Sequence, residues 1–154
     1  MSKSLKRVRA ALIAAGLPDT IRETVLARTA GDAAQALGCD IDQIAKSIIF
    51  RGAQTGRIIL FITAGGQRVD PARASALANE PLEKADAGQI RTVTGFAIGG
   101  VAPIGHLTPP LGFFDKKLIE FDTVWAAAGT PNHVFSIEPA DLLNYSATQL
   151  SDFT

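Results

Sequence analysis

Lys46 is the residue whose type and setting point most directly to chemistry. If the segment 45–51 (AKSIIFR) is a strand, Lys46, Ile48 and Phe50 share one face, so the lysine lies beside two large apolar side chains. A lysine there needs a partner, a pocket, or a path by which its long stem reaches water. Two interpretations remain open: a lysine that snorkels at a strand end, or a cleft lysine whose ammonium holds a phosphate or a developing oxyanion.

A glycine-rich loop supplies the second candidate. Residues 99–106 read GGVAPIGH. Glycines let backbone N–H and C=O groups approach a ligand closely, and Pro103 stiffens the loop. The same composition suits a tight turn between strands, and His106 is either an acid, base or hydrogen-bond donor or an ordinary surface histidine. The run lacks the lysine of a P-loop and does not follow the GxGxxG pattern.

The cysteine and histidine content excludes several other sites. The chain has one cysteine, Cys39, so a disulfide framework, a four-cysteine zinc site and a CxxC pair are excluded within it. His106 and His133 lie far apart and do not form an HExxH motif, and we predict no metal site. No basic residue adjoins Cys39, which favours a packed structural thiol. A lone thiol is easiest to keep reduced in the cytosol, so we expect a cytoplasmic protein.

Length and charge narrow the class of protein. The chain has 154 residues, which fits one domain, and 47% of them are hydrophobic. Fifteen basic residues balance fifteen acidic ones, which argues against a nucleic-acid coat, a DNA-binding role or a polybasic membrane binder. No apolar run approaches the roughly 18–20 residues of a membrane span. Local basic character is expected from Lys3, Lys6, Arg7, Arg9, Arg51 and Arg57.

The first residues have two interpretations. Basic residues followed by an apolar run imitate the order of a signal peptide. However, Leu5, Val8, Leu12 and Ala15 recur at helical spacing, with the charges on the other face. We therefore predict an ordinary amphipathic helix over 3–16.

The elements that would position these residues mix strands and helices without regular alternation. The run 57–64 is apolar on both faces and predicts a central strand, joined to 45–51 by a hairpin loop. Residues 94–112 are rich in glycine and proline and predict a long loop. The mixture indicates an α+β (mixed α/β) single domain with an antiparallel or mixed sheet. Further strands are expected over 21–27, 113–119, 124–128, 133–137 and 147–153, and helices over 30–37 (capped by Thr29), 40–44, 71–79, 85–89 and 139–143.

Three motifs together resemble a known family. Lys46 within AKSIIF, the Gly-Gly-x-x-Pro-x-Gly-His run that starts at Gly99, and the Ala-Gly turn at Gly129 occur in the order seen in the YbaK/EbsC family. This family is also called the prolyl-tRNA synthetase-associated (INS-like) editing domain. The resemblance extends from about Thr20 to Phe153. It implies one editing domain over 1–154, with its core at about 20–153, built on a curved, barrel-like sheet flanked by helices.

The resemblance also implies an activity. Members hydrolyse mischarged aminoacyl-tRNA as free-standing enzymes, most often tRNA(Pro) that carries a wrong small amino acid such as Ala, Cys, Ser, Thr or 2-aminobutyrate. No metal or organic cofactor is expected. The expected partners are the 3′ aminoacyl end of the tRNA and, for some members, prolyl-tRNA synthetase.

The family's functional positions can be carried over residue by residue. The helix before the lysine strand lines the aminoacyl pocket in relatives, and its small residues here indicate a pocket roomier than one made for alanine alone. The resemblance implies catalytic roles for Lys46, Gly100 and His106, and substrate-binding roles for Ala30, Ala33, Phe50, Gly99, Pro103 and Gly129.

The implied activity is compatible with a sequence that has no GxSxG nucleophile motif. A synthetase pocket discriminates against a substrate smaller by one methylene by only ~1–3 kcal/mol, so a second hydrolytic site is a usual remedy. The bond is an activated ester, and the absence of a GxSxG triad suits attack by water with positioning alone. In the family, the terminal 2′-hydroxyl of the tRNA is thought to assist. The alternatives are a non-catalytic module that binds an aminoacyl end, nucleotide or protein, and a hydrolase of another small ester or amide.

Overall fold

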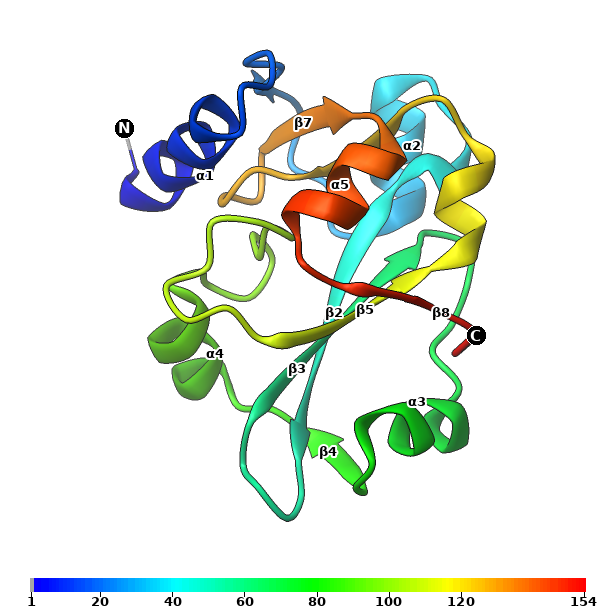
Figure 1. Cartoon of the computed structure of the whole chain (residues 1–154). Coiled ribbons are helices and arrows are strands. Elements are labelled where there is room, and N and C mark those ends of the chain that lie inside the picture. The colour runs from blue at the N-terminus through cyan, green and yellow to red at the C-terminus, as the bar shows by residue number, and fades with distance from the viewer. Residues whose placement is uncertain (1) are drawn as a thin grey trace.

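The computed structural model describes residues 2–154 as a mixed α+β fold, which confirms the predicted fold class (Figure 1). The helices are α1 (Lys3–Ala14), α2 (Ala30–Leu37), α3 (Pro71–Ala78), α4 (Ala87–Thr94) and α5 (Pro139–Tyr145), with short 3₁₀ helices η1 (Ile41–Gln43) and η2 (Lys116–Glu120). The strands are β1 (Arg22–Glu23), β2 (Ala45–Gly52), β3 (Ile58–Ala64), β4 (Leu82–Lys84), β5 (Leu111–Asp115), β6 (Val124–Ala127), β7 (His133–Ile137) and β8 (Gln149–Ser151).

The strands form two sheets. The larger has the order β4-β2-β3-β5-β8 and is mixed, because β2 is antiparallel to both of its neighbours while β5 is parallel to β3 and β8. The smaller has the order β1-β7-β6 and is antiparallel. A parallel bridge between Ile44 and Trp125 brings the start of β2 against β6. The expected mixed sheet is therefore present, but over residues 2–154 it takes the form of two open sheets rather than a closed barrel.

β2 is paired unequally on its two edges. On one edge its register with β3 runs from Ala45 opposite Ala64 to Arg51 opposite Ile58. On the other edge, β4 covers β2 only from Phe50 to Gly52. Within the described residues, the stretch of β2 before Phe50 thus has a second edge that no ladder covers.

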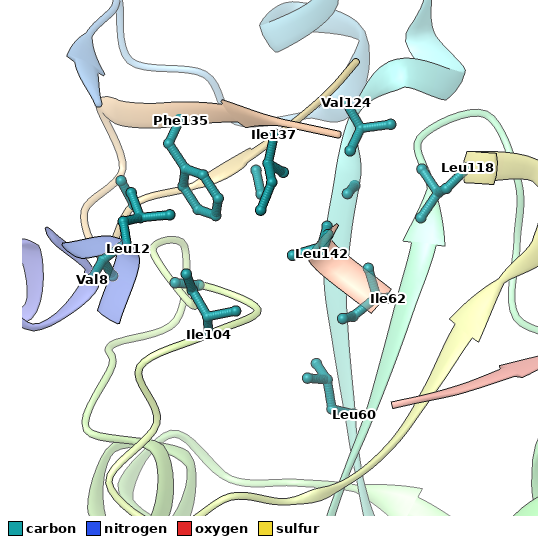
Figure 2. Packing of buried hydrophobic residues seen from close by; sticks show 14 of the residues in the cluster. Val8, Leu12, Leu60, Ile62, Ile104, Leu118, Val124, Phe135, Ile137 and Leu142 are labelled. Carbon is teal, nitrogen blue, oxygen red and sulfur yellow. The ribbon is translucent and has the colours of Figure 1, made fainter. Parts of the chain in front are cut away.

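β3 carries the core on both faces, as its unbroken apolar sequence predicts. All seven of its residues are buried. Leu60 and Ile62 project into the main cluster, which also receives side chains from α1, β6, β7 and α5 (Figure 2). On the opposite face, Ile59 and Phe61 pack against α3, and the Phe61 and Phe113 rings stack with their centroids 5.3 Å apart. Burial on both sides fixes β3, and β3 in turn fixes the position of β2.

The predicted N-terminal helix is confirmed. Within α1, Leu5, Val8 and Leu12 are buried and belong to the main cluster (Figure 2). The helical spacing of these residues is therefore the spacing of a core-facing stripe. Between residues 2 and 154, no helix is long and apolar enough to cross a bilayer.

Local capping explains why α2, η1 and β2 follow one another closely. The Thr29 hydroxyl accepts a hydrogen bond from the Asp32 N–H at 3.0 Å and starts α2, as predicted. Gly38 ends α2 with φ +69°. Asp40 and Gln43 then form a complete capping box around η1. The chain enters β2 directly after this short helix, so Lys46 lies close to the end of the α2–η1 unit.

Several predicted elements differ from the structure, and one of them is the strand expected over 147–153, which is limited to Gln149–Ser151. The strand expected over 21–27 is limited to Arg22–Glu23. The strand expected over 113–119 ends at Asp115, because that carboxylate accepts a hydrogen bond from the Lys117 N–H and caps η2. The helix expected over 85–89 begins at Ala87, where Asp86 caps it, and continues to Thr94. The short strand β4, which precedes it, was not predicted.

Candidate active site

A cleft of about 970 Å³ opens along the uncovered edge of β2. Its walls come from α2 and the residues before it, the 65–68 turn, the 98–101 part of the glycine-rich loop, β6, and the turn that leads into β7. Lys46, Ala30, Ala33 and Gly99 all line it, so the structure brings four of the predicted site residues together.

The Lys46 ammonium is held by two backbone carbonyls. Its Nζ donates hydrogen bonds to the carbonyl oxygen of Gln67 at 2.8 Å and to that of Gly65 at 3.2 Å. An ammonium has three N–H donors, so one is left for a ligand in the cleft. Ile48 and Phe50 share the lysine's face, as predicted, and pack against the Phe61 cluster. Lys46 thus has both hydrogen-bond partners and a pocket.

The charges around Lys46 shift its proton affinity. Burial lowers the pKa of Lys46 from its ordinary value of 10.5, and the positive charge of Arg68 lowers it further. The carboxylates of Asp42 and Asp115 act in the opposite direction. The balance favours a lysine that gives up its proton more readily than a surface lysine does.

Small side chains of α2 form part of the cleft wall. Ala30 and Ala33 of α2 line the cleft, and Trp125 of β6 packs with them in one cluster. The residues carried over for the aminoacyl pocket therefore face the same space as the lysine.

The two loop glycines have different surroundings. Gly99 lines the cleft with φ +92°, a backbone conformation that glycine adopts readily. Gly100 does not line it; a Cβ at Gly100 would lie 2.9 Å from the Cα of Thr130, so the loop lies directly against the turn before β7. Gly129 has φ +96° and is packed against the backbone of Ser4 in α1. Gly100 and Gly129 are thus sites of close backbone packing and do not line the cleft.

The loop histidine and two other predicted residues lie elsewhere. His106 is not among the residues that line the cleft; its Nε2 lies 2.6 Å from the carbonyl oxygen of Ala102, and its ring packs edge-on against Phe96. Burial lowers the pKa of His106 below its ordinary 6.5. Pro103 is buried, and Phe50 packs against Phe61 with ring centroids 5.7 Å apart; neither lines the cleft.

A second histidine, for which sequence reasoning assigned no role, does line the cleft. His133 begins β7, and its Nδ1 is 2.6 Å from the Thr130 hydroxyl, which also lines the cleft. The hydrogen bond fixes the orientation of the imidazole ring. The sequence feature that could have identified His133 is its position directly after the predicted Gly-Thr-Pro-Asn turn, close to Gly129.

The cleft is cationic although the chain is neutral. Arg28, Arg68 and Lys84 line it together with Lys46, and none of the described lining residues is Asp or Glu. The basic residues singled out from the sequence do not converge in this way, because Arg9, Arg51 and Arg57 form ion pairs and Arg7 donates to the carbonyls of Gly95 and Gly105. The asymmetry favours an anionic ligand.

Residues suited to metal binding do not gather in this fold. No group of three or more His, Cys, Asp or Glu side chains that could hold a metal is found over residues 2–154. Cys39 is half-buried beside α2, and burial raises the pKa of its thiol, which disfavours the nucleophilic thiolate. The cleft lining offers lysine, arginine, histidine, hydroxyl and backbone groups.

These features define a class of site: a cationic cleft with a positioned ammonium and backbone groups for an ester or phosphate. The family model of the aminoacyl-tRNA editing domain matches residues 24–145. The chain belongs to this family. It is an aminoacyl-tRNA deacylase, a hydrolase of the ester between an amino acid and tRNA.

Relatives and solved structures agree with this assignment. The "Uncharacterized protein YwhH" of Bacillus subtilis is 30% identical over 122 residues, which cover 79% of this chain and 77% of the relative. The "Putative Cys-tRNA(Pro)/Cys-tRNA(Cys) deacylase EbsC" of Enterococcus faecalis is 24% identical over 82% of this chain and 77% of its own length. The crystal structure of "a putative trans-editing enzyme for prolyl tRNA synthetase" is 40% identical, with a TM-score of 0.92 over 100% of this chain and 98% of the other.

Proposed function

We propose that this deacylase acts in trans on tRNA(Pro) that carries a wrong small amino acid, and that Lys46 is its central catalytic residue. The observation that carries the proposal is the Lys46 ammonium, which keeps one donor free in a cleft with a small-residue wall and a cationic lining. The name of EbsC refers to Cys-tRNA(Pro) and Cys-tRNA(Cys), and that of the similar trans-editing structure refers to prolyl-tRNA synthetase. Both names support tRNA(Pro) as a substrate.

In the proposed reaction, water attacks the carbonyl carbon of the ester. The carbonyl oxygen becomes an oxyanion, and the attacking water gives up a proton. The bond to the ribose oxygen then breaks, and that oxygen leaves with this proton, relayed by the neighbouring ribose hydroxyl, so the products are the free amino acid and uncharged tRNA. Lys46 holds the terminal phosphate or the carbonyl side through its free N–H, and backbone groups at Gly99 position the aminoacyl end. An activated ester needs little more than such positioning.

The positions of the cations support an RNA end as the ligand. Arg28 and Arg68 line the cleft, and Arg68 is near enough to Lys46 to lower its pKa. Lys84 is the cross-strand partner of Phe50, four residues further along β2. Four residues of strand correspond to about 13 Å, at a rise of about 3.3 Å per residue. We propose that these side chains contact the phosphates of the unpaired 3′ end, which gives local affinity to a protein without net charge.

The size of the amino acid is limited by the α2 wall. Ala30 and Ala33 leave more space than larger residues would, so we propose that the pocket accepts Ala, Cys, Ser, Thr or 2-aminobutyrate. Prolyl-tRNA synthetase is the proposed partner, because it makes the erroneous product.

The test is hydrolysis of tRNA(Pro) charged separately with each of these five amino acids and with proline. We expect loss of at least one of the five, with prolyl-tRNA(Pro) spared. If none of the five is hydrolysed, tRNA(Pro) editing is refuted. Binding of the same charged tRNAs without hydrolysis would instead support a non-catalytic module.

A further inference from the structure

The turn that holds Lys46 is itself held by η1. The Gly66 N–H donates a hydrogen bond to Oδ1 of Asp42 at 2.8 Å. A Cβ at Gly66 would lie 2.7 Å from that same oxygen, and a Cβ at Gly65 would overlap the carbonyl oxygen of Ile41. The turn therefore lies flush against η1, and this close approach requires glycine at both positions.

The Asp42 contact lies between the two acceptors of the lysine. Lys46 donates to the carbonyls of Gly65 and Gln67, and Gly66, whose N–H is bound by Asp42, separates these two residues. A shift of the turn would move both acceptors at once. Because the two carbonyls orient the ammonium, they also determine where its third N–H points.

The 3₁₀ helix that carries Asp42 is itself close in the chain to part of the cleft wall. η1 follows α2 after a three-residue link, and α2 supplies Ala30 and Ala33 to the cleft wall. The backbone of η1 is stiffened by its capping box and by the hydrogen bond from the Asp42 N–H to the Asp40 side chain. Asp42 thus attaches the lysine-holding turn to the unit that supplies Ala30 and Ala33 to the cleft wall.

We propose that Asp42 is a positioning residue, which fixes the Lys46 ammonium relative to the aminoacyl wall by binding the Gly66 N–H. The proposal rests on the proposed function for the catalytic role of Lys46. Asp42 itself does not line the cleft and acts through the turn. It places the ammonium for the transition state, so its loss should lower kcat more than it changes KM.

Paired variants separate geometry from charge. Asp42→Ala removes the acceptor, whereas Asp42→Asn keeps an oxygen for Gly66 and loses only the charge. With the panel ester that the wild type hydrolyses fastest, we expect kcat to fall about 10- to 100-fold in Asp42→Ala, since misplacement by about 1 Å can cost 100-fold. Asp42→Asn should keep most of the wild-type kcat. Rates are compared at one pH well below the midpoint of Lys46, because loss of the Asp42 charge lowers the pKa of Lys46, which also senses Arg68 and Asp115.

A second variant tests the same contact from the other side. Gly66→Ala leaves Asp42 in place but inserts a Cβ against its carboxylate, so we expect a similar fall in kcat. Asp122→Ala is the matched control, because Asp122 is exposed and does not line the cleft. The proposal is wrong if folded Asp42→Ala keeps wild-type kcat, or if Asp42→Asn is as impaired as Asp42→Ala.

A spectroscopic measurement does not depend on turnover. In low-temperature proton–nitrogen spectra, the hydrogen-bonded ammonium of Lys46 should give a slowly exchanging signal, assigned by its loss in Lys46→Ala. We expect this signal to persist in Asp42→Asn and to broaden or vanish in Asp42→Ala. Persistence in Asp42→Ala overturns the proposal. If no panel ester is hydrolysed, the proposed function fails, and this signal still decides the role of Asp42.

Discussion

The Lys46 ammonium lies 2.8 Å from the carbonyl oxygen of Gln67, and this hydrogen bond, with the one to Gly65, ties the start of β2 to the turn that follows β3. Lys46 is paired across the sheet with Thr63, so the hairpin brings the turn back within reach of the lysine. The contact explains why a cation is tolerated on an otherwise apolar strand face: backbone carbonyls satisfy two of its donors, and the cleft receives the third.

The pH dependence of deacylation should follow the charge on Lys46. Burial and Arg68 lower the pKa of Lys46, so activity should decline as pH rises through a midpoint below 10.5. Arg68→Gln removes the repelling charge, which raises the pKa and moves the decline to higher pH. Initial rates across pH, corrected for spontaneous ester hydrolysis, provide the test, with Arg91→Gln as the control outside the cleft. An unmoved or lowered midpoint in Arg68→Gln would contradict this account of the electrostatics.

Phosphate contacts should appear as salt dependence. Replacement of Lys84 with Gln removes one cation from the cleft lining, so tRNA binding should weaken. The plot of log K against log salt should also become less steep, with its negative slope reduced in size by about 0.7, the value for one phosphate of a single strand. Lys116→Gln, at an exposed site outside the cleft, should leave both unchanged. Equal slopes for wild type and Lys84→Gln would show that Lys84 makes no phosphate contact.

Local patterns were sufficient to predict the strand and loop that carry the candidate site. The alternation in 45–51 placed Lys46 on the face of Ile48 and Phe50, and the apolar run 57–64 predicted the central β3 beside it. Thr29 was correctly predicted to cap α2. These features depend on neighbours within a few residues, which a sequence displays directly.

Features that depend on distant segments were not predicted. The parallel pairing of β5 with β3 and β8 leaves no local pattern, and neither does the packing of Gly100 on Thr130. His133 was not assigned a role because nothing local shows that its turn meets the glycine-rich loop. Tertiary structure likewise places His106 behind the loop and selects Arg28, Arg68 and Lys84 as the cleft cations.

The contact between the glycine-rich loop and the β7 turn gives a test of loop geometry. Gly100→Ala would insert a Cβ 2.9–3.0 Å from the Thr130 backbone, and Thr130 holds His133. We expect a loss of stability of about 1–3 kcal/mol from overpacking, together with a lower kcat/KM. Gly99→Ala adds backbone strain without a new contact. Comparison of the two variants therefore separates the effect of the Thr130 contact from that of backbone strain. Wild-type stability and activity in Gly100→Ala would show that the two loops are not tightly packed.

His106 should make the stability of the fold depend on pH. Burial lowers the pKa of His106, so the unfolded chain binds a proton more readily than the folded one. The stabilisation is complete above about pH 6.5, the ordinary pKa of histidine, and is lost as pH falls toward the lower folded value. Denaturant unfolding at pH 5 and pH 7.5 gives the change in the free energy of unfolding between the two pH values. We expect this change to be smaller in His106→Gln than in the wild type, and to be as large in the control His133→Gln as in the wild type. The same dependence in all three proteins would exclude His106 as its source.

The most direct test of the central claim is single-turnover hydrolysis of mischarged tRNA(Pro) by the wild type and by Lys46→Ala, with Lys116→Ala as the matched control. Circular dichroism first establishes that all three are folded. The account predicts hydrolysis by the wild type and Lys116→Ala, and only the spontaneous rate with Lys46→Ala. Hydrolysis by Lys46→Ala at the wild-type rate would contradict it, because the positioned ammonium would then not be the group on which deacylation depends.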